Sequence, residues 1–145
     1  MKKILLAITF CVFSTVCSMA QPGGKRFSPE EFEAKLEAFI TDEAGFTPSE
    51  AKAYYPIYHE MKDKQRQLQC KIFEIKKHLS PYASDKECAN AITDITKLNK
   101  QKAQLEETYY KSLCKAVPAR KVFRAMQAED KFHRQMLDHM NHKRR

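Results

Sequence analysis

The fold is decided by residues 46–79, FTPSEAKAYYPIYHEMKDKQRQLQCKIFEIKKHL. Thr47 suits a helix N-cap, Pro48 the first helical position and Glu50 the return partner of a capping box. Core-facing positions then recur at alternating steps of four and three residues, a heptad pattern interrupted only by Gln65. These positions are Tyr54, Tyr58, Met61, Gln65, Leu68, Ile72, Ile75 and Leu79. The pattern predicts one long helix.

Pro56 lies inside this predicted helix. A proline there removes the hydrogen bond to the carbonyl of Lys52, at a cost of about 3 kcal/mol. Because the heptad pattern keeps its phase across Pro56, we expect the helix to continue and to bend. The count from the pattern places Pro56 on the side facing away from the partner helix, where water can reach the freed carbonyl.

A second heptad pattern covers residues 85–115, after a capping box at Ser84 and Glu87. Its positions are Cys88, Ala91, Ile95, Leu98, Lys102, Leu105, Tyr109 and Ser112. Only four residues, Ser80-Pro81-Tyr82-Ala83, separate it from the first pattern, which is enough for an antiparallel return and little else. The centre of the molecule is therefore predicted to be a long, curved antiparallel helical hairpin.

Two further helices are predicted on either side, over residues 29–44, with Gly45 past the end, and over residues 118–139. Glycine is scarce and tryptophan absent, which suits helices throughout. The predicted fold is all-α, with four helices around the hairpin. Because one hairpin cannot bury both of its faces, the outer helices should cover part of it, and a second subunit of a homodimer is the expected cover for the rest.

Residues 1–20 have the features of a secretory signal peptide. Lys2 and Lys3 precede an apolar run over residues 4–16 that is too short to span a bilayer, and Ser18-Met19-Ala20 supplies small residues for cleavage. Lipidation at Cys17 is the alternative, although Val16 fits that pattern poorly. The expected organisation is a signal peptide (1–20), a flexible N-terminus (21–27), a helical domain (28–140) and a basic tail (141–145).

The chain without residues 1–20 keeps 24 of 26 Lys and Arg residues against 18 acidic ones, a net charge of 24 − 18 = +6. Export makes nucleic acid an unexpected partner for this charge. The expected partners are acidic proteins, lipid headgroups or envelope polymers. The alternative is that the charge only keeps a solvated surface soluble. No further apolar run could span a membrane.

Three cysteines remain after removal of the signal peptide, namely Cys70, Cys88 and Cys114. An odd number in an oxidising compartment leaves one thiol over. Antiparallel register separates Cys70 and Cys88 by about 7 Å along the axis, so a disulfide between them needs a looser turn. Cys114 is the candidate for a link between chains.

Four features together resemble the periplasmic Spy/CpxP-like family. They are the signal peptide, the helix start Phe46-Thr47-Pro48-Ser49-Glu50, the hairpin, and the late helix after Val117-Pro118 that contains Glu129 and Phe132. That family contains envelope-stress chaperones and adaptors, and is related to metal sensors of the CnrX and ZraP type. The family signature L-T-x-x-Q is altered here, with Phe46 for Leu and Glu50 for Gln, and its second copy keeps only Pro118. The resemblance implies a periplasmic, often dimeric, curved cradle that holds unfolded proteins without ATP.

A chaperone needs exposed apolar groups surrounded by charge. We therefore predict a client-binding surface near the bend, formed by Tyr54, Tyr55, Ile57, Tyr58, Lys62, Lys64 and Arg66. The alternative is that the aromatic side chains contact the first and last helices and that the basic ones form a solvated rim. The expected partners are unfolded or stressed envelope proteins, or a membrane signalling protein whose response the chain regulates.

A metal-binding sensor is the alternative function. The C-terminal helix carries a group of nitrogen and sulfur side chains that suit zinc or copper, namely His133, Met136, His139, Met140 and His142. Methionines at this spacing also serve as core residues, and histidines near a helix end also face solvent. The metal-sensing relatives use ligands on an early helix, whereas residues 29–44 contain no His or Cys. No other cofactor is expected.

Enzymatic activity is not expected. The sequence has no glycine-rich phosphate loop, and Glu106 and Glu107 occupy adjacent, diverging helix positions. A slender helical hairpin also offers no deep pocket in which to desolvate a reaction. The sequence therefore predicts a binding protein.

Overall fold

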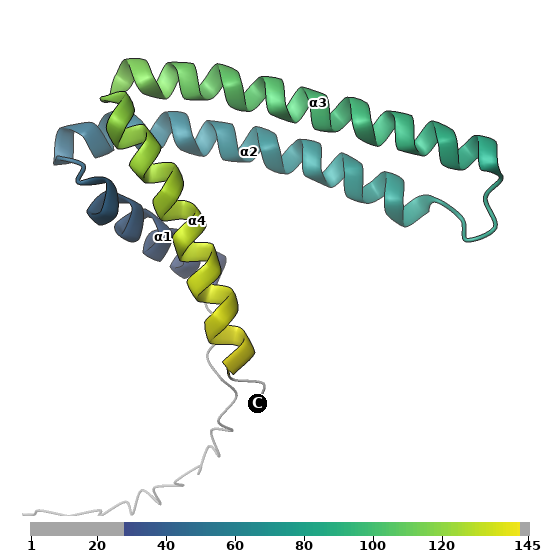
Figure 1. The fold of residues 1–145 in the computed structure, drawn as a ribbon, viewed down its shortest axis with the longest axis horizontal. Helices are drawn as coiled ribbons and strands as arrows, with labels where there is room; N and C mark the ends of the chain where they lie inside the picture. Colours follow the sequence, from purple (N-terminus) through teal and green to yellow (C-terminus); the bar gives the residue numbers. More distant parts are fainter. Residues whose placement is uncertain (1–27, 143–145) are drawn as a thin grey trace, which may run out of the picture.

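The computed structural model describes residues 28–142, apart from the side chain of Met140. These residues form four helices, α1 (Pro29–Ala44), α2 (Pro48–His78), α3 (Asp85–Ala116) and α4 (Ala119–His142), and contain no strand (Figure 1). The predicted all-α class is confirmed. The expected signal peptide, the N-terminal segment 21–27 and residues 143–145 of the basic tail lie outside the described residues.

The helices begin where the capping signals indicate. Ser28, Thr47 and Ser84 each form a complete capping box with the glutamate three residues later. Gly45 ends α1 in the left-handed conformation, with φ +66°, which a residue with a Cβ adopts at a cost. α4 begins one residue later than expected, and it ends at His142 rather than near residue 139. Part of the expected basic tail is therefore helical.

α2 continues through Pro56, as its heptad pattern predicts. Pro56 is exposed, whereas Tyr54 and Tyr58 on either side of it are buried. The ring and the unbonded Lys52 carbonyl therefore do not disturb the packed face of the helix.

The helices are arranged as two pairs that diverge from a common corner (Figure 1). α2 and α3 lie side by side, joined by the short turn between Leu79 and Ser84, and α1 packs along α4. We call residues 67–104, the part of α2 and α3 that projects beyond the other two helices, the arm. The remainder of the described chain is the head.

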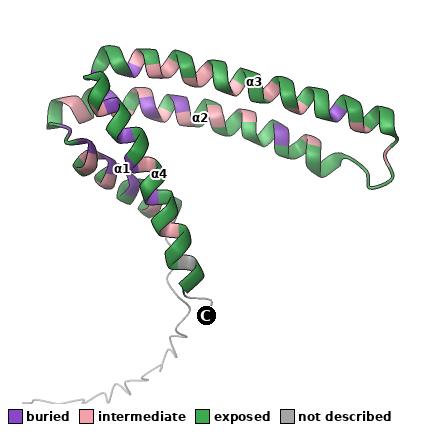
Figure 2. Cartoon of the chain, viewed as in Figure 1, coloured by how far each residue is buried: buried purple, intermediate pink, exposed green. Residues whose placement is uncertain are grey.

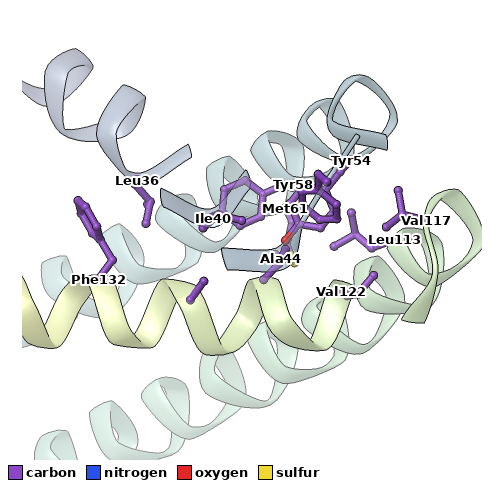
Figure 3. Packing of buried hydrophobic residues seen from close by; sticks show 13 residues of the cluster. Leu36, Ile40, Ala44, Tyr54, Tyr58, Met61, Leu113, Val117, Val122 and Phe132 are labelled. Carbon is purple, nitrogen blue, oxygen red and sulfur yellow. The ribbon is translucent and has the colours of Figure 1, made fainter. Parts of the chain in front are cut away.

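The hydrophobic core lies in the head (Figure 2). Side chains from all four helices meet there around Ile40, Met61 and Leu113, none of which is exposed (Figure 3). Within the arm only Ile72 and Ala91 are buried. The head therefore supplies most of the hydrophobic stabilisation, and the arm is a thin pair of helices.

No helix within residues 28–142 combines the length and apolarity needed to cross a bilayer. The structure describes one chain, so the homodimer stays a prediction.

Candidate binding site: the arm and the inner groove

The arm exposes large apolar side chains. Phe73 is 58% exposed, Ile92 65% and Tyr82 95%, and Leu79 is also exposed. The arm carries seven lysines and four acidic residues, a net charge of 7 − 4 = +3. Side chains of this size are often buried in monomeric proteins, so their exposure makes the arm a candidate binding surface.

The aromatic residues of the predicted client-binding surface lie elsewhere. Tyr54 and Tyr58 are buried in the head core, where α1 and α4 cover this face of α2 (Figure 3). Tyr55 and Ile57 are half-buried and pack against the same core. The expectation that this cluster is exposed is therefore wrong for Tyr54 and Tyr58, and the contact with the outer helices is what the structure shows.

The predicted basic residues have partners of different kinds. Lys62 pairs with Glu129 of α4 and lies 5.2 Å from the centre of the Tyr58 ring. The ammonium of Lys64 is 2.7 Å from Glu60 and 2.5 Å from the Tyr109 hydroxyl of α3, and these hydrogen bonds raise its pKa. Arg66 reaches only the exposed Asp63 of its own helix, at 3.2 Å. Lys62 and Lys64 therefore connect helices, whereas Arg66 remains open to a ligand.

A groove of about 670 Å³ lies in the angle between the two helix pairs. We call it the inner groove. Its lining comes from all four helices, with Ser28, Pro29, Phe32, Glu33, Leu36 and Glu37 near α1, Tyr58, Lys62, Gln65, Arg66 and Gln69 on α2, Lys102 on α3, and Glu129 and His133 on α4. Its volume falls in the range of sites that bind small ligands or short peptide segments.

Tyr58, which is buried, and Glu129 are among the residues that line this groove. Glu129 pairs with Lys62 and lies 3.6 Å from His133 Nε2. The Tyr58 hydroxyl is buried and has no hydrogen-bond partner among residues 28–142. Burial, reinforced by the negative charge of Glu129, raises the Tyr58 pKa, so the phenol stays neutral.

Among the described residues, the three histidines of the predicted metal site do not belong to a group that could share a metal ion. His133 stands beside the Phe32 ring, with 6.0 Å between centroids, and Met136 packs against the core. His139 and His142 are exposed, and the side chain of Met140 lies outside the described residues. The structure instead brings together Glu33, Glu37 and His59, whose ligand atoms all lie within 4.8 Å of one another.

Sequence analysis missed this second cluster because its members come from two helices. Glu33 and Glu37 are one turn apart on α1, and His59 reaches across from α2, with its Nε2 2.8 Å from Glu37 Oε1. The spacing of the two glutamates was the only local signal. Two carboxylates and an imidazole are ligands that suit zinc.

Cys70, Cys88 and Cys114 are free thiols in this structure. Cys70 is exposed beside a shallow groove of about 550 Å³ between α2 and α3, with Asp94 and Leu98 opposite. Cys88 lies near the tip, its sulfur 4.0 Å from the Ala83 carbonyl. The disulfide between Cys70 and Cys88, for which the sequence required a looser turn, is not formed in this structure.

The residues of the family signature have structural contacts. Phe46 is buried against Tyr54, with 4.7 Å between ring centroids, and Thr47, Pro48 and Glu50 begin α2. Glu50 also pairs with Lys121 of α4 at 2.6 Å, and Pro118 directly precedes that helix. These residues position the helices.

No family model matches the chain, and neither a curated protein nor a solved structure was found to match it. The resemblance to the Spy/CpxP-like family therefore stays a prediction, and function is inferred from geometry.

Proposed function

We propose that this protein is an exported, ATP-independent holding chaperone of the Spy/CpxP-like kind, which binds unfolded envelope proteins in the periplasm. The observation that supports it is the exposure of four large side chains on the arm, Phe73, Leu79, Tyr82 and Ile92. A membrane signalling protein regulated through the same surface is the adaptor form of this proposal. Curvature of the α2–α3 pair and a homodimer belong to it as well.

The physical basis is weak binding spread over many contacts. Isolated apolar side chains on a thin arm each bury only part of their surface against a client, so no single contact fixes its sequence. The surrounding lysines favour acidic clients by long-range attraction and keep the unoccupied arm soluble. Such a surface can hold and release a client without a nucleotide cycle.

The experiment is an aggregation assay with a reduced, unfolding client and residues 21–145. The test variant is Phe73→Ser with Ile92→Ser, and the control is Phe123→Ser, because Phe123 on α4 has the same side chain and is 59% exposed. We expect the unaltered protein and the control to keep the client soluble, and the test variant to lose most of this effect. Full aggregation at a molar excess of the unaltered protein, or equal losses in both variants, would contradict the proposal.

A zinc-responsive sensor is the second candidate, and the convergence of Glu33, Glu37 and His59 favours it. Calorimetric titration with Zn²⁺ tests it, with His59→Ala as the variant. His78→Ala is the matched control, because His78 also lies 2.8 Å from a glutamate, Glu74, but one turn away on its own exposed helix. Binding lost only in His59→Ala supports the sensor, and absence of binding heat in the unaltered protein ends it.

A further inference from the structure

We propose that the inner groove binds the free C-terminal carboxylate of an extended peptide whose last side chains are apolar. This inference rests on the proposed chaperone function and names the part of a client that would be held where the arm meets the head. It concerns other residues than the exposed apolar side chains of the arm.

Lys102 is the residue that points to an anion. Three lysines of residues 28–142 are half-buried, Lys62, Lys102 and Lys121. Lys62 pairs with Glu129, and Lys121 pairs with Glu50 at 2.6 Å. Lys102 has no carboxylate within ion-pair distance among the described residues, although it occupies a core-facing heptad position on α3. A half-buried ammonium without a counter-charge is costly, so an anionic ligand at this place would be stabilised.

Further hydrogen-bond donors stand beside Lys102 on the same wall of the groove. Gln69 has no hydrogen-bond partner in the described part of the chain, and Arg66 is held only by the exposed Asp63 at 3.2 Å. A guanidinium can hold both oxygens of a carboxylate, while an ammonium and an amide complete its hydrogen bonds. The wall formed by α2 and α3 is therefore suited to a carboxylate.

The α1 side of the groove carries apolar side chains beside the carboxylates of Glu33 and Glu37, and Glu37 is paired with His59. The apolar side chains are those of Pro29, Phe32 and Leu36. Phe32 is held edge to face against Phe132 of α4, with 5.4 Å between ring centroids. A small inorganic anion would leave these apolar side chains in contact with water. A ligand that carries apolar side chains next to its carboxylate would cover both sides of the groove.

A fatty acid offers the same combination of a carboxylate and an apolar body. The groove, however, also contains the amide side chain of Gln69, which an alkyl chain would desolvate without a hydrogen bond in return. The backbone amides of a peptide can pair with such a group. The polar lining therefore favours a peptide.

The test is fluorescence anisotropy with residues 21–145 and an N-terminally labelled short peptide ending in Leu-Val-Phe, as the free acid or the C-terminal amide. We expect the free acid to bind about tenfold more tightly than the amide, since the amide lacks the charge-assisted hydrogen bonds. Lys102→Met should remove this difference. Lys100→Met is the matched control, because Lys100 is an exposed neighbour on α3 outside the groove, and it should keep the difference.

Equal binding of acid and amide, or an unchanged preference in Lys102→Met, would overturn the inference. Displacement of the peptide by dodecanoate at lower concentration than by unlabelled peptide would also overturn it, in favour of a fatty acid. Failure here is distinguishable from failure of the chaperone proposal, because the Phe73→Ser, Ile92→Ser variant should still bind the peptide. Conversely, Lys102→Met should still suppress client aggregation through the arm.

Discussion

The rings of Tyr55 and Tyr58 meet edge to face, with 6.2 Å between centroids and 87° between planes, yet only one of the two hydroxyls is hydrogen-bonded. The Tyr55 hydroxyl lies 2.6 Å from Thr41 Oγ1 and donates to the Glu37 carbonyl at 2.7 Å, which ties α2 to α1. The Tyr58 hydroxyl is buried without a partner in residues 28–142. Loss of each hydroxyl is therefore expected to affect stability differently.

Removing each hydroxyl separately tests this difference. Tyr55→Phe should lower the free energy of unfolding by about 1–2 kcal/mol, because it removes the two hydrogen bonds through which the Tyr55 hydroxyl connects α2 to Thr41 and Glu37 of α1. Tyr58→Phe should leave the free energy of unfolding unchanged or raise it, because the hydroxyl that it removes is buried without a hydrogen bond. Urea denaturation followed by far-ultraviolet dichroism measures both. Equal destabilisation by the two variants would show that Tyr58 has a partner after all.

The buried tyrosines predict loss of stability at high pH. Burial is the largest cause that raises the pKa of Tyr54, Tyr58 and Tyr110, and it raises that of Tyr110 to about 12, whereas an unfolded tyrosine ionises near about pH 10. Because the folded pKa is higher, this stabilisation is complete below the unfolded pKa and is lost as the pH rises above it. Between the unfolded and the folded pKa, Tyr54 and Tyr58 together should lower the free energy of unfolding by about 3 kcal/mol for each pH unit.

Alkaline denaturation, followed by tyrosinate absorbance and dichroism together, checks this prediction. The late ionisation of the buried phenols should coincide with unfolding, and Tyr58→Phe should reduce the slope by the contribution of one group. Tyrosinate absorbance that is complete before the helices unfold would contradict the burial of these residues.

The helices could be predicted from the sequence because their determinants are local. Thr47 and Glu50 form a capping box over three residues, and the heptad phase across Pro56 required no knowledge of other helices. The positions of α1 and α4 were harder to predict. Tyr54 and Tyr58 fit a heptad whichever helix covers them, so spacing alone did not reveal that α1 and α4 bury them in the head.

The candidate sites were less predictable still. Glu37 and His59 are separated by 22 residues, and the inner groove takes residues from four helices, so both depend on the angle between the helix pairs. Local patterns do not encode that angle. What the sequence did contain was Lys102 at a core-facing heptad position, a conflict between residue type and position of the kind found at functional sites.

The arm should open locally before the head unfolds. Only Ile72 and Ala91 are buried within it, so few apolar contacts protect its backbone hydrogen bonds. Ser84→Ala removes the capping box at the start of α3 and should cost about 1 kcal/mol locally, which is roughly a fivefold faster amide exchange near the tip. The melting temperature should change little.

Thr47→Ala is the matched control, since it removes the same type of capping box in the head. It should lower the melting temperature of the whole protein and leave exchange at the tip of the arm unchanged. Hydrogen–deuterium exchange with peptide-level resolution, combined with thermal unfolding, separates the two outcomes. Uniform protection along α2 and α3 would show that something covers the arm in solution, such as a second copy of the chain.

Substitution of Pro56 should change both the stability of the protein and its binding of the peptide. Pro56→Ala restores the hydrogen bond to the Lys52 carbonyl and removes the ring from an exposed position in α2, so the free energy of unfolding should rise by about 1–3 kcal/mol. The inner groove takes residues from α2 and from the other three helices, so if α2 bends at Pro56, as proposed, a straighter helix should also weaken binding of the carboxylate peptide. Pro81→Ala, in the exposed turn at the tip of the arm, is the control and should lower stability slightly by loosening the unfolded chain.

Small-angle scattering should show a changed radius of gyration for Pro56→Ala alone. A stabilised variant with unchanged scattering and unchanged peptide affinity would mean that Pro56 does not set the angle on which the inner groove depends.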